Sequence, residues 1–312
     1  MRRSRTLVAG VAALALVISA CGTDTAEPTT TTSDEATTTA APTTSTTEAA
    51  TTTTAAPATT TTSPEPAAGA AYFLLDELEE DAGGPFLVPV YREIPAGADE
   101  LTAALEALIA GPTQDEMDGT PAISTAIPEG TTINGIDVDD EVAIIDLSAE
   151  FDDGGGSFSM FARLAQVVYT ATRVDDVDEV EFLIDGEPVT VFSSEGIELD
   201  GPQERSDYYD QMLPPIFVDE PAWGEPVTSP VEVEGLSNVF EAVSQVMLTD
   251  DDGLTLDEET VMATCGTGCW GEWETELTYT VDREQFGALI VWEFSAKDGS
   301  RINVREYPVQ LR

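Results

Sequence analysis

The most regular pattern of apolar residues runs from Leu101 to Ile109, where apolar side chains recur three or four positions apart. This spacing predicts an amphipathic helix with one face in a core. Asp99 precedes the helix as a predicted N-cap, and Gly111, which a proline follows, ends it. A second stripe of the same spacing follows a run of three glycines, with Ser157 as its predicted N-cap. Two helices are therefore expected in this part of the chain.

Short apolar runs around these helices predict β-strands. They cover residues 72–75, 87–91, 131–138, 142–147, 180–184 and 189–192. Pro89 indicates an edge strand or a bulge, because proline cannot donate to a strand ladder. The run from Val142 to Ile145 lacks alternation, which predicts a strand buried on both faces, and Asp185-Gly186 predicts a hairpin before residues 189–192 return. Together these elements predict an α+β domain in which both helices pack on one mixed sheet.

The last hundred residues have a different texture, because short alternating runs replace the helical stripes. Strands are predicted at residues 216–219, 231–233, 240–248, 261–265, 276–281, 289–294 and 302–309. Asp252-Gly253 and Asp298-Gly299 mark hairpin turns. Seven short strands in so few residues are typical of an all-β immunoglobulin-like sandwich.

The start of the chain predicts export. Three arginines within the first five residues precede an apolar run from Leu7 to Ala20, which is the arrangement of a signal peptide. As a helix the run rises about 21 Å, less than the roughly 30 Å core of a bilayer. Ile18-Ser19-Ala20-Cys21 resembles a bacterial lipobox, so Cys21 is the predicted lipid attachment site. An ordinary signal peptide with a chance cysteine is the alternative.

A linker follows the predicted anchor. Residues 21–70 are rich in Thr, Ala and Pro, and residues 22–70 contain no aromatic or large aliphatic side chain. Such a segment cannot offset its ordering entropy and is predicted to be disordered, serving as a plain spacer or an O-glycosylated stalk. The predicted domains are therefore a lipoprotein signal peptide (1–20), a linker (21–70), the α+β domain (71–212) and the sandwich (213–312).

Charge excludes several functions. The chain has 12 basic and 60 acidic residues, no histidine and a formal net charge of −48. Nucleic acid is excluded as a partner because the basic footprint is missing, and direct adhesion to anionic headgroups should be repelled. The lack of histidine excludes Ser/His/Asp catalysis, and no phosphate loop or cofactor motif is present. We predict no cofactor and no catalytic residue.

Ordered landmarks in the first domain carry a family resemblance. They are Leu87-Val88-Pro89-Val90-Tyr91-Arg92, Ala107 to Thr113, Ile127 to Thr131, Ile145-Asp146-Leu147-Ser148 with Phe151, and Ile184-Asp185-Gly186. In this order they resemble the GerM-type domain (GerMN) of sporulation and spore-germination lipoproteins. The resemblance supplies no catalytic residue, and it does not imply that the organism forms spores.

The second domain has landmarks of its own. They are Val227-Thr228-Ser229-Pro230, Val233-Glu234-Gly235, Asn238 to Ala242 and Asp298-Gly299. They resemble the immunoglobulin-like domain of bacterial spore-germination proteins, which commonly accompanies the GerM-type domain. Each resemblance therefore supports the other.

One cysteine pair stands out as a candidate site. Cys265 and Cys269 flank a Gly-Thr-Gly turn, and in an exported protein they are predicted to form a disulfide. Closing so small a loop contributes roughly 2 kcal/mol before any strain. A metal site or a redox pair is the alternative, although two thiolates without histidine are too few for a closed zinc site.

Acidic runs and aromatic residues are weaker candidates. Asp250 to Gly253 invites a calcium interpretation but lacks the EF-hand spacing, so a solvated hairpin tip is preferred, as it is for the acidic runs at 139–141 and 151–153. The aromatics Tyr208, Tyr209 and Trp223 could form a recognition surface or pack between domains. Trp270 and Trp273 are predicted to enter the sandwich core.

These observations predict a non-enzymatic, lipid-anchored protein on the outer face of a bacterial membrane. Its two binding modules would engage a protein partner in the envelope. A peptidoglycan-binding or other glycan-binding module is the alternative. A wall hydrolase is a weaker one, because carboxylate pairs arise by chance among 60 acids.

Overall fold

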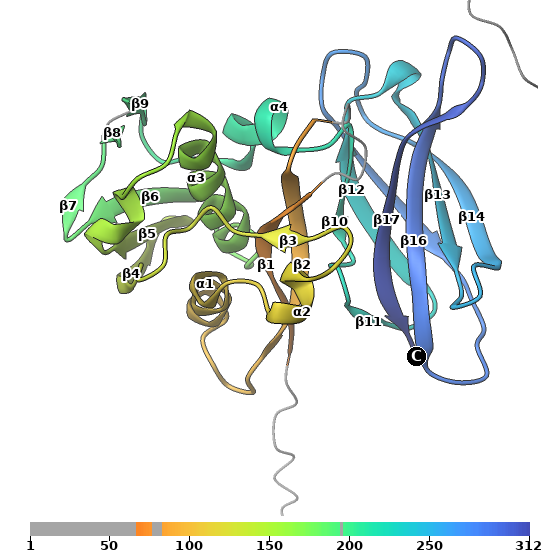
Figure 1. The fold of residues 1–312 in the computed structure, drawn as a ribbon, viewed down its shortest axis with the longest axis horizontal. Helices are drawn as coiled ribbons and strands as arrows, with labels where there is room; N and C mark the ends of the chain where they lie inside the picture. The colour runs from red at the N-terminus through yellow and green to blue at the C-terminus, as the bar shows by residue number, and fades with distance from the viewer. Residues whose placement is uncertain (1–66, 77–82, 194–195) are drawn as a thin grey trace, which may run out of the picture. The chain divides into compact units, whose positions relative to one another are not determined.

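The computed structural model describes residues 67–76, 83–193 and 196–312, which lie within one compact unit, residues 60–312 (Figure 1). The predicted signal peptide, Cys21 and most of the predicted linker lie outside the described residues. Ala67–Ala70, assigned to the linker from composition, belong instead to the first strand. Backbone pairing with the next strand holds these small residues in place.

The α+β domain begins with a three-stranded antiparallel sheet. β1 (Ala67–Leu75) lies between β2 (Phe86–Ile94) and β3 (Ile123–Ser124). β2 is therefore an edge strand, which confirms the prediction made from Pro89. The outer side of β2 is bridged by Trp223, whose N–H donates to the Pro89 carbonyl (2.8 Å).

A second, mixed sheet has the order β4-β5-β6-β7. β5 (Val142–Leu147) and β6 (Glu179–Ile184) run parallel, and such strands require a long crossover, which contains α3 (Ser157–Ala171). β4 (Ile133–Asp139) pairs antiparallel with β5. Burial alternates along β5, so the prediction of a strand buried on both faces was wrong.

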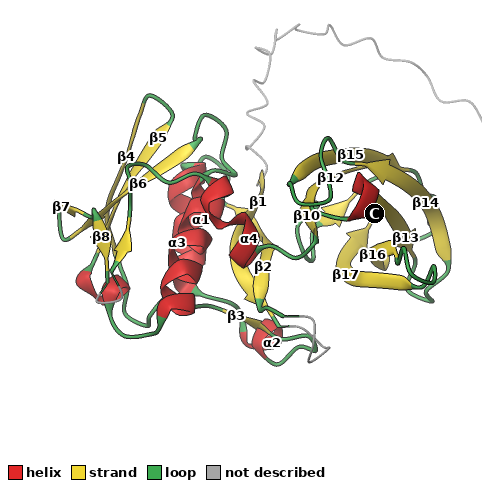
Figure 2. Cartoon of the chain, turned by 90° about the horizontal axis from the view of Figure 1, so that it is seen from above, coloured by secondary structure: helices red, strands yellow, loops and turns green. Residues whose placement is uncertain are grey.

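The two long helices lie between these sheets rather than on one of them (Figure 2). α1 (Glu100–Ala110) has the predicted caps, since the Asp99 carboxylate accepts from the N–H of Thr102 and Gly111 has a φ of 81°. The N-cap of α3 is Gly156, so Ser157 is its first residue and not its cap. From Ala162 to Ala171 every residue of α3 is buried, because the helix has packing partners on more than one side. The single-sheet prediction was therefore wrong.

Short elements complete the domain. The return strand after the Asp185-Gly186 turn is β7 (Glu187–Pro188), not residues 189–192. Val191–Phe192 (β8) pairs instead with Ile197–Glu198 (β9). The remaining short helices are α2 (Gln114–Met117), η1 (Ala149–Asp152), η2 (Arg205–Tyr208) and α4 (Tyr209–Met212).

The rest of the chain is an immunoglobulin-like β-sandwich, as predicted. One sheet has the order β10-β12-β15 and the other β11-β17-β16-β13-β14. The strands are β10 (Ile216–Glu220), β11 (Pro226–Val227), β12 (Val231–Ser237), β13 (Val243–Thr249), β14 (Thr255–Met262), β15 (Gly271–Leu277), β16 (Gln285–Phe294) and β17 (Arg301–Leu311).

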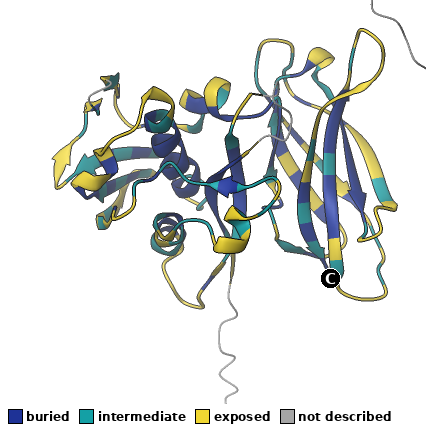
Figure 3. Ribbon diagram, viewed as in Figure 1, coloured by how far each residue is buried: buried dark blue, intermediate teal, exposed yellow. Residues whose placement is uncertain are grey.

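Several strand limits differ from those predicted. Phe240–Ala242 is a short 3₁₀ turn (η3) ahead of β13, and β15 ends at Leu277. β14 begins at Thr255 rather than near Val261, because its polar residues form an exposed edge strand that hydropathy does not reveal. Both hairpin turns occur where Asp-Gly predicted them. Figure 3 shows buried positions along the strands and exposed ones at the turns.

Candidate functional site

A cluster of three partly buried charged side chains and one buried tyrosine joins the two domains. Its members come from β1 (Tyr72), the end of α3 (Arg173), η2 (Arg205) and β10 (Asp219). Arg205 Nη1 lies 2.5 Å from Asp219 Oδ2, and Arg173 Nη1 lies 3.7 Å from Asp219 Oδ1. The Tyr72 hydroxyl donates to Asp219 Oδ1. We call these four residues the charge cluster.

The surroundings of the charge cluster fix its protonation. Burial raises the pKa of Tyr72 to about 12, and the carboxylate of Asp219 adds to the effect. Burial also acts to raise the pKa of Asp219, but Arg205 and Arg173 outweigh it and hold that pKa below its ordinary value. Burial acts to lower the pKa of Arg205, but Asp219 and Tyr72 outweigh it and raise that pKa above its ordinary value. The cluster therefore keeps its carboxylate ionised and its phenol neutral at ordinary pH.

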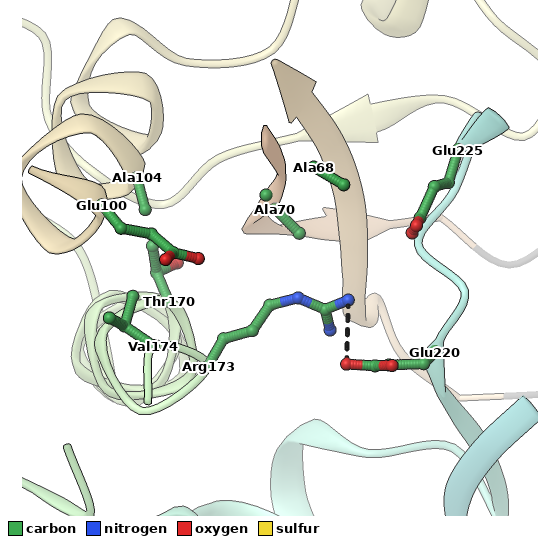
Figure 4. Close-up of a pocket in the computed structure, with 10 residues that line it drawn as sticks. Ala68, Ala70, Glu100, Ala104, Thr170, Arg173, Val174, Glu220 and Glu225 are labelled. Carbon is green, nitrogen blue, oxygen red and sulfur yellow. Dashed lines mark ion pairs between the residues drawn. The ribbon is translucent and has the colours of Figure 1, made fainter. Parts of the chain in front are cut away.

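A groove lies beside the charge cluster (Figure 4). Its volume is about 210 Å³. It is lined by Ala68, Gly69 and Ala70 of β1, Glu100 and Ala104 of α1, Thr170, Arg173 and Val174 at the end of α3, and Glu220 and Glu225. We call it the β1 groove.

The walls of the β1 groove carry more negative than positive charge. Arg173 Nη2 lies 3.5 Å from Glu220 Oε1, so these two groups neutralise each other. Glu225 accepts a hydrogen bond from the N–H of Ala222 (2.8 Å), and burial raises the pKa of its carboxyl. Glu100 projects from the first turn of α1 on the opposite wall. A cation would be complementary to these walls.

Cys265 and Cys269 form a disulfide in the structure, with Cα atoms 5.8 Å apart. The loop that they close holds the turn before β13. The N–H of Thr267 donates to the Val239 carbonyl (2.8 Å), and the N–H of Gly268 donates to Asn238 Oδ1 (2.8 Å). The loop therefore fixes the conformation of η3.

Large apolar side chains are exposed at the same end of the sandwich. Met262 lies opposite Val243, and Trp292 lies opposite Gln245. Because side chains alternate along strands, Met262 and Phe294 share one face of the sheet. The exposed fractions are 74% for Met262, 51% for Phe294, 51% for Phe240, 53% for Val304 and 40% for Ile302. Ile302 lies opposite Glu293, the neighbour of Phe294, so it is on the other face of the sheet from Phe294. We call these five residues, which share one end of the sandwich but not one face, the apolar end.

The acidic runs have local roles in the structure. Asp250 Oδ1 accepts from the N–H groups of Asp252 and Leu254 and thereby closes the hairpin turn. Asp251 pairs with Arg283 at 2.6 Å. In the residues that the structure describes, no group of three or more acids or cysteines is arranged to hold a metal ion. In the acidic run 151–153, Phe151 is fully buried and packs against Phe182 and Phe192.

The aromatic residues named as candidates have different surroundings in the structure. Tyr208 is 2% exposed and so cannot belong to a surface. Tyr209 and Trp270 lie with ring centroids 5.7 Å apart, and Trp270 Nε1 donates to Asp210 Oδ1 (2.8 Å). Trp273 enters the sandwich core as predicted, whereas Trp270 is only partly buried. These contacts, like Trp223 on β2, join the two domains.

In the described part of the chain no helix has both the length and the apolar character needed to span a bilayer. The fold and the groups above define a two-domain protein in which an α+β domain precedes an immunoglobulin-like domain.

The families of both domains follow from sequence. Residues 70–190 match the Germane family, described as "Sporulation and spore germination". Residues 215–300 match the Gmad2 family, described as "Immunoglobulin-like domain of bacterial spore germination". The chain thus contains a region that matches the Germane family followed by a region that matches the Gmad2 family, which confirms both resemblances.

Three solved structures are similar to parts of the chain. The first GerMN domain of the sporulation protein GerM from Bacillus subtilis is 22% identical, with 45% of this chain and 99% of that chain covered and a TM-score of 0.35. The tandem GerMN domains of the same protein are 16% identical, with 70% and 63% covered and a TM-score of 0.37. A candidate lipoprotein from Clostridium perfringens is 23% identical, with 46% and 90% covered and a TM-score of 0.31. No curated protein sequence matches this chain.

Proposed function

We propose that this chain is a lipid-anchored protein of the bacterial cell envelope that binds a protein partner and catalyses no reaction. Cys21 carries the lipid, the linker spans part of the envelope, and the two domains form the binding unit. The descriptions of both families, which name spore germination, support a role in an envelope assembly of that type.

The apolar end is the observation that carries the protein-binding proposal. Water-exposed clusters of large apolar side chains mark interaction sites in soluble domains. Here Met262 and Phe294 are exposed on one face of a sheet, in a chain with a formal net charge of −48. Lys297 and Arg301 flank Phe294 on the β16–β17 hairpin and are exposed. The complementary partner surface is therefore apolar where it meets Met262 and Phe294.

The disulfide loop supports the same proposal. Its hydrogen bonds to residues 238 and 239 hold the turn that presents Phe240. A surface that is rigid before binding loses less entropy when the partner docks. The loop thus prepares the apolar end for binding.

The ionisable groups support a role without chemistry. A general acid or base must reach a substrate and have a pKa near the working pH. Asp219 pairs with Arg205 and Arg173, and the Tyr72 hydroxyl donates to Asp219, so the ionisable groups of the charge cluster are engaged with one another. Their arrangement supports a structural role.

The apolar end is tested by affinity capture from detergent-solubilised envelopes, with the anchored full-length chain as bait. The Met262→Ser, Phe294→Ser double variant removes two exposed apolar side chains. We expect at least a tenfold loss of one captured partner protein. Leu254→Ser is the matched control, because Leu254 is equally apolar and 67% exposed but lies in the turn at the other end of β13.

Two results contradict the proposal. One is a partner that the double variant captures as well as the natural chain does. The other is saturable binding to purified wall fragments with no protein captured, which would establish the glycan-binding alternative. Circular dichroism of both variants checks that the fold is retained.

A further inference from the structure

Strand β1 has one edge that is paired only at its end. β2 pairs with β1 along all nine residues, from Ala67 to Leu75. On the other edge β3 pairs only with Leu74 and Leu75. The earlier residues of β1 therefore face something other than a strand on that side.

From Ala68 to Asp76, the backbone N–H and C=O groups of the even-numbered residues point toward the side of β1 that pairs with β3. The N–H of Asp76 donates to the Ala122 carbonyl (3.0 Å), and Leu74 pairs with Ser124. At Tyr72, two side chains of α3 replace the strand. The Tyr72 N–H donates to Thr170 Oγ1 (3.0 Å), and its carbonyl accepts from Gln166 Nε2 (2.9 Å).

Ala70 and Ala68 come next in this series. Because backbone groups alternate along an antiparallel strand, the N–H and C=O of both residues point to the same edge. Among residues 67–76, 83–193 and 196–312, no protein group bonds to them there. The β1 groove begins at these two residues, and Ala70 is only 2% exposed. The peptide group of Ala70, so little exposed, strongly favours a hydrogen-bonding partner, whereas Ala68 is exposed to water.

The shape of the groove suits an extended backbone. Ala68, Gly69 and Ala70 have no side chain long enough to cover the edge of their own strand. The facing walls come from α1, from the end of α3 and from residues 220–225, and Figure 4 shows Glu100 and Glu225 on opposite sides of the alanines. Figure 4 shows the guanidinium of Arg173, which pairs with Glu220, between Glu100 and Glu225. Three carboxylates of the groove thus share one cation, and the remaining negative charge favours a second one.

We propose that the edge of β1 at Ala68 and Ala70 binds an extended peptide segment of a partner protein by strand addition, with a Lys or Arg of that segment between Glu100 and Glu225. This specifies a second contact with the partner proposed above and rests on that function. Strand addition draws its affinity from main-chain hydrogen bonds and its specificity from pockets for the side chains. The groove provides both.

The probe is the capped peptide Thr-Val-Arg-Val-Thr, titrated into the isotopically labelled mature chain with its linker. Amide resonances report the binding site. We expect saturable shifts at Ala68 and Ala70. The peptide Thr-Val-Glu-Val-Thr has the same strand propensity and the opposite charge, and it should not bind. Raising the salt to about 1 M should weaken binding of the basic peptide, because its charge contact is partly exposed.

Two variants locate the contacts. Ala68→Pro removes one N–H that points into the groove and leaves the ladder to β2 intact, since that ladder uses the odd-numbered residues. It should weaken binding of the basic peptide about fivefold to tenfold, the effect of one lost hydrogen bond. Glu225→Gln should weaken it by a similar factor. Glu106→Gln, on an exposed position of α1 away from the groove, is the control and should bind normally.

Three results would overturn the proposal. They are no saturable binding of the basic peptide, equal binding of the acidic peptide, and groove amides already bonded to the chain's own linker. Both proposals would be supported if Ala68→Pro lost peptide binding while capture of the partner protein still depended on Met262 and Phe294. If the basic peptide does not bind but the partner protein is still captured, strand addition is wrong and the apolar end remains the binding site.

Discussion

Asp219→Asn is the substitution that tests most sharply how the two domains are held together. The change keeps the size of the side chain but removes the negative charge that pairs with Arg205 at 2.5 Å and with Arg173 at 3.7 Å. Arg205 is then left without a carboxylate partner, whereas Arg173 keeps its ion pair with Glu220 (3.5 Å). Removing one partner of a buried ion pair costs about 3–5 kcal/mol.

The structure places the expected cost at the lower end of that range. The side chains of Arg205, Arg173 and Asp219 retain 20%, 15% and 23% of their exposure, so water screens part of the lost attraction. We expect a loss of about 3 kcal/mol in the free energy of unfolding. For about 240 folded residues this corresponds to a fall in melting temperature of roughly 6–12 °C at pH 7.

Thermal unfolding followed by circular dichroism measures this difference, with Asp251→Asn as the matched control. Asp251 also pairs with an arginine, but Arg283 is 65% exposed, and exposed ion pairs contribute only about 0–1 kcal/mol. Because the pKa of Asp219 is lowered in the folded protein, its contribution is present above about pH 4 and is lost as the pH falls through the lowered value. Equal melting temperatures for the two variants at pH 7 would refute the role given to the charge cluster.

Three further predictions follow from single groups. Because the folded pKa of Tyr72 is raised from 10.0 to about 12, the natural chain should lose about 3 kcal/mol of stability between these pH values, and chemical denaturation of Tyr72→Phe should show a smaller loss. Gly235→Ala should prevent stable folding of the sandwich, since its Cβ would lie 2.1 Å from the Phe217 carbonyl oxygen; Gly135→Ala, with nothing within 4 Å, should change the melting temperature little. Cys21→Ser should release the protein from the membrane fraction in cell fractionation, and retention there would contradict lipid attachment.

The sequence alone predicted those elements whose conformation depends mainly on their own residues. The stripe from Leu101 to Leu108, with Asp99 before it and Gly111 after it, predicts α1 with both caps. The turns at Asp252-Gly253 and Asp298-Gly299 follow from the same kind of local preference. The two fold classes were predicted because helical and strand periodicities occupy different parts of the chain.

Properties that depend on distant residues were not predictable in this way. The periodicity of α3 reveals an apolar face but not a second sheet on its other side. The charge cluster joins residues that are separated by as many as 147 positions, such as Tyr72 and Asp219. One signal was present, because Arg173 follows an apolar helix in a chain with few basic residues, and such an arginine requires a buried partner.

The β1 groove was missed for a related reason. Composition assigned Ala67–Ala70 to the linker, since alanine and glycine predict no strand on their own. Only the pairing with β2 makes them part of a sheet. The apolar end could have been suspected from Phe294 and Ile302, but alternation alone does not reveal which face of a sheet is covered.

Site-specific photocrosslinking in living cells tests the central claim most directly. A photoreactive amino acid would replace Phe294 at the apolar end, and the same group at Leu254, at the opposite end of β13, would serve as the control. We expect one dominant envelope protein to be joined to the chain from position 294 and not from position 254. Crosslinks only to wall glycan or lipid, or the same pattern from both positions, would contradict the account.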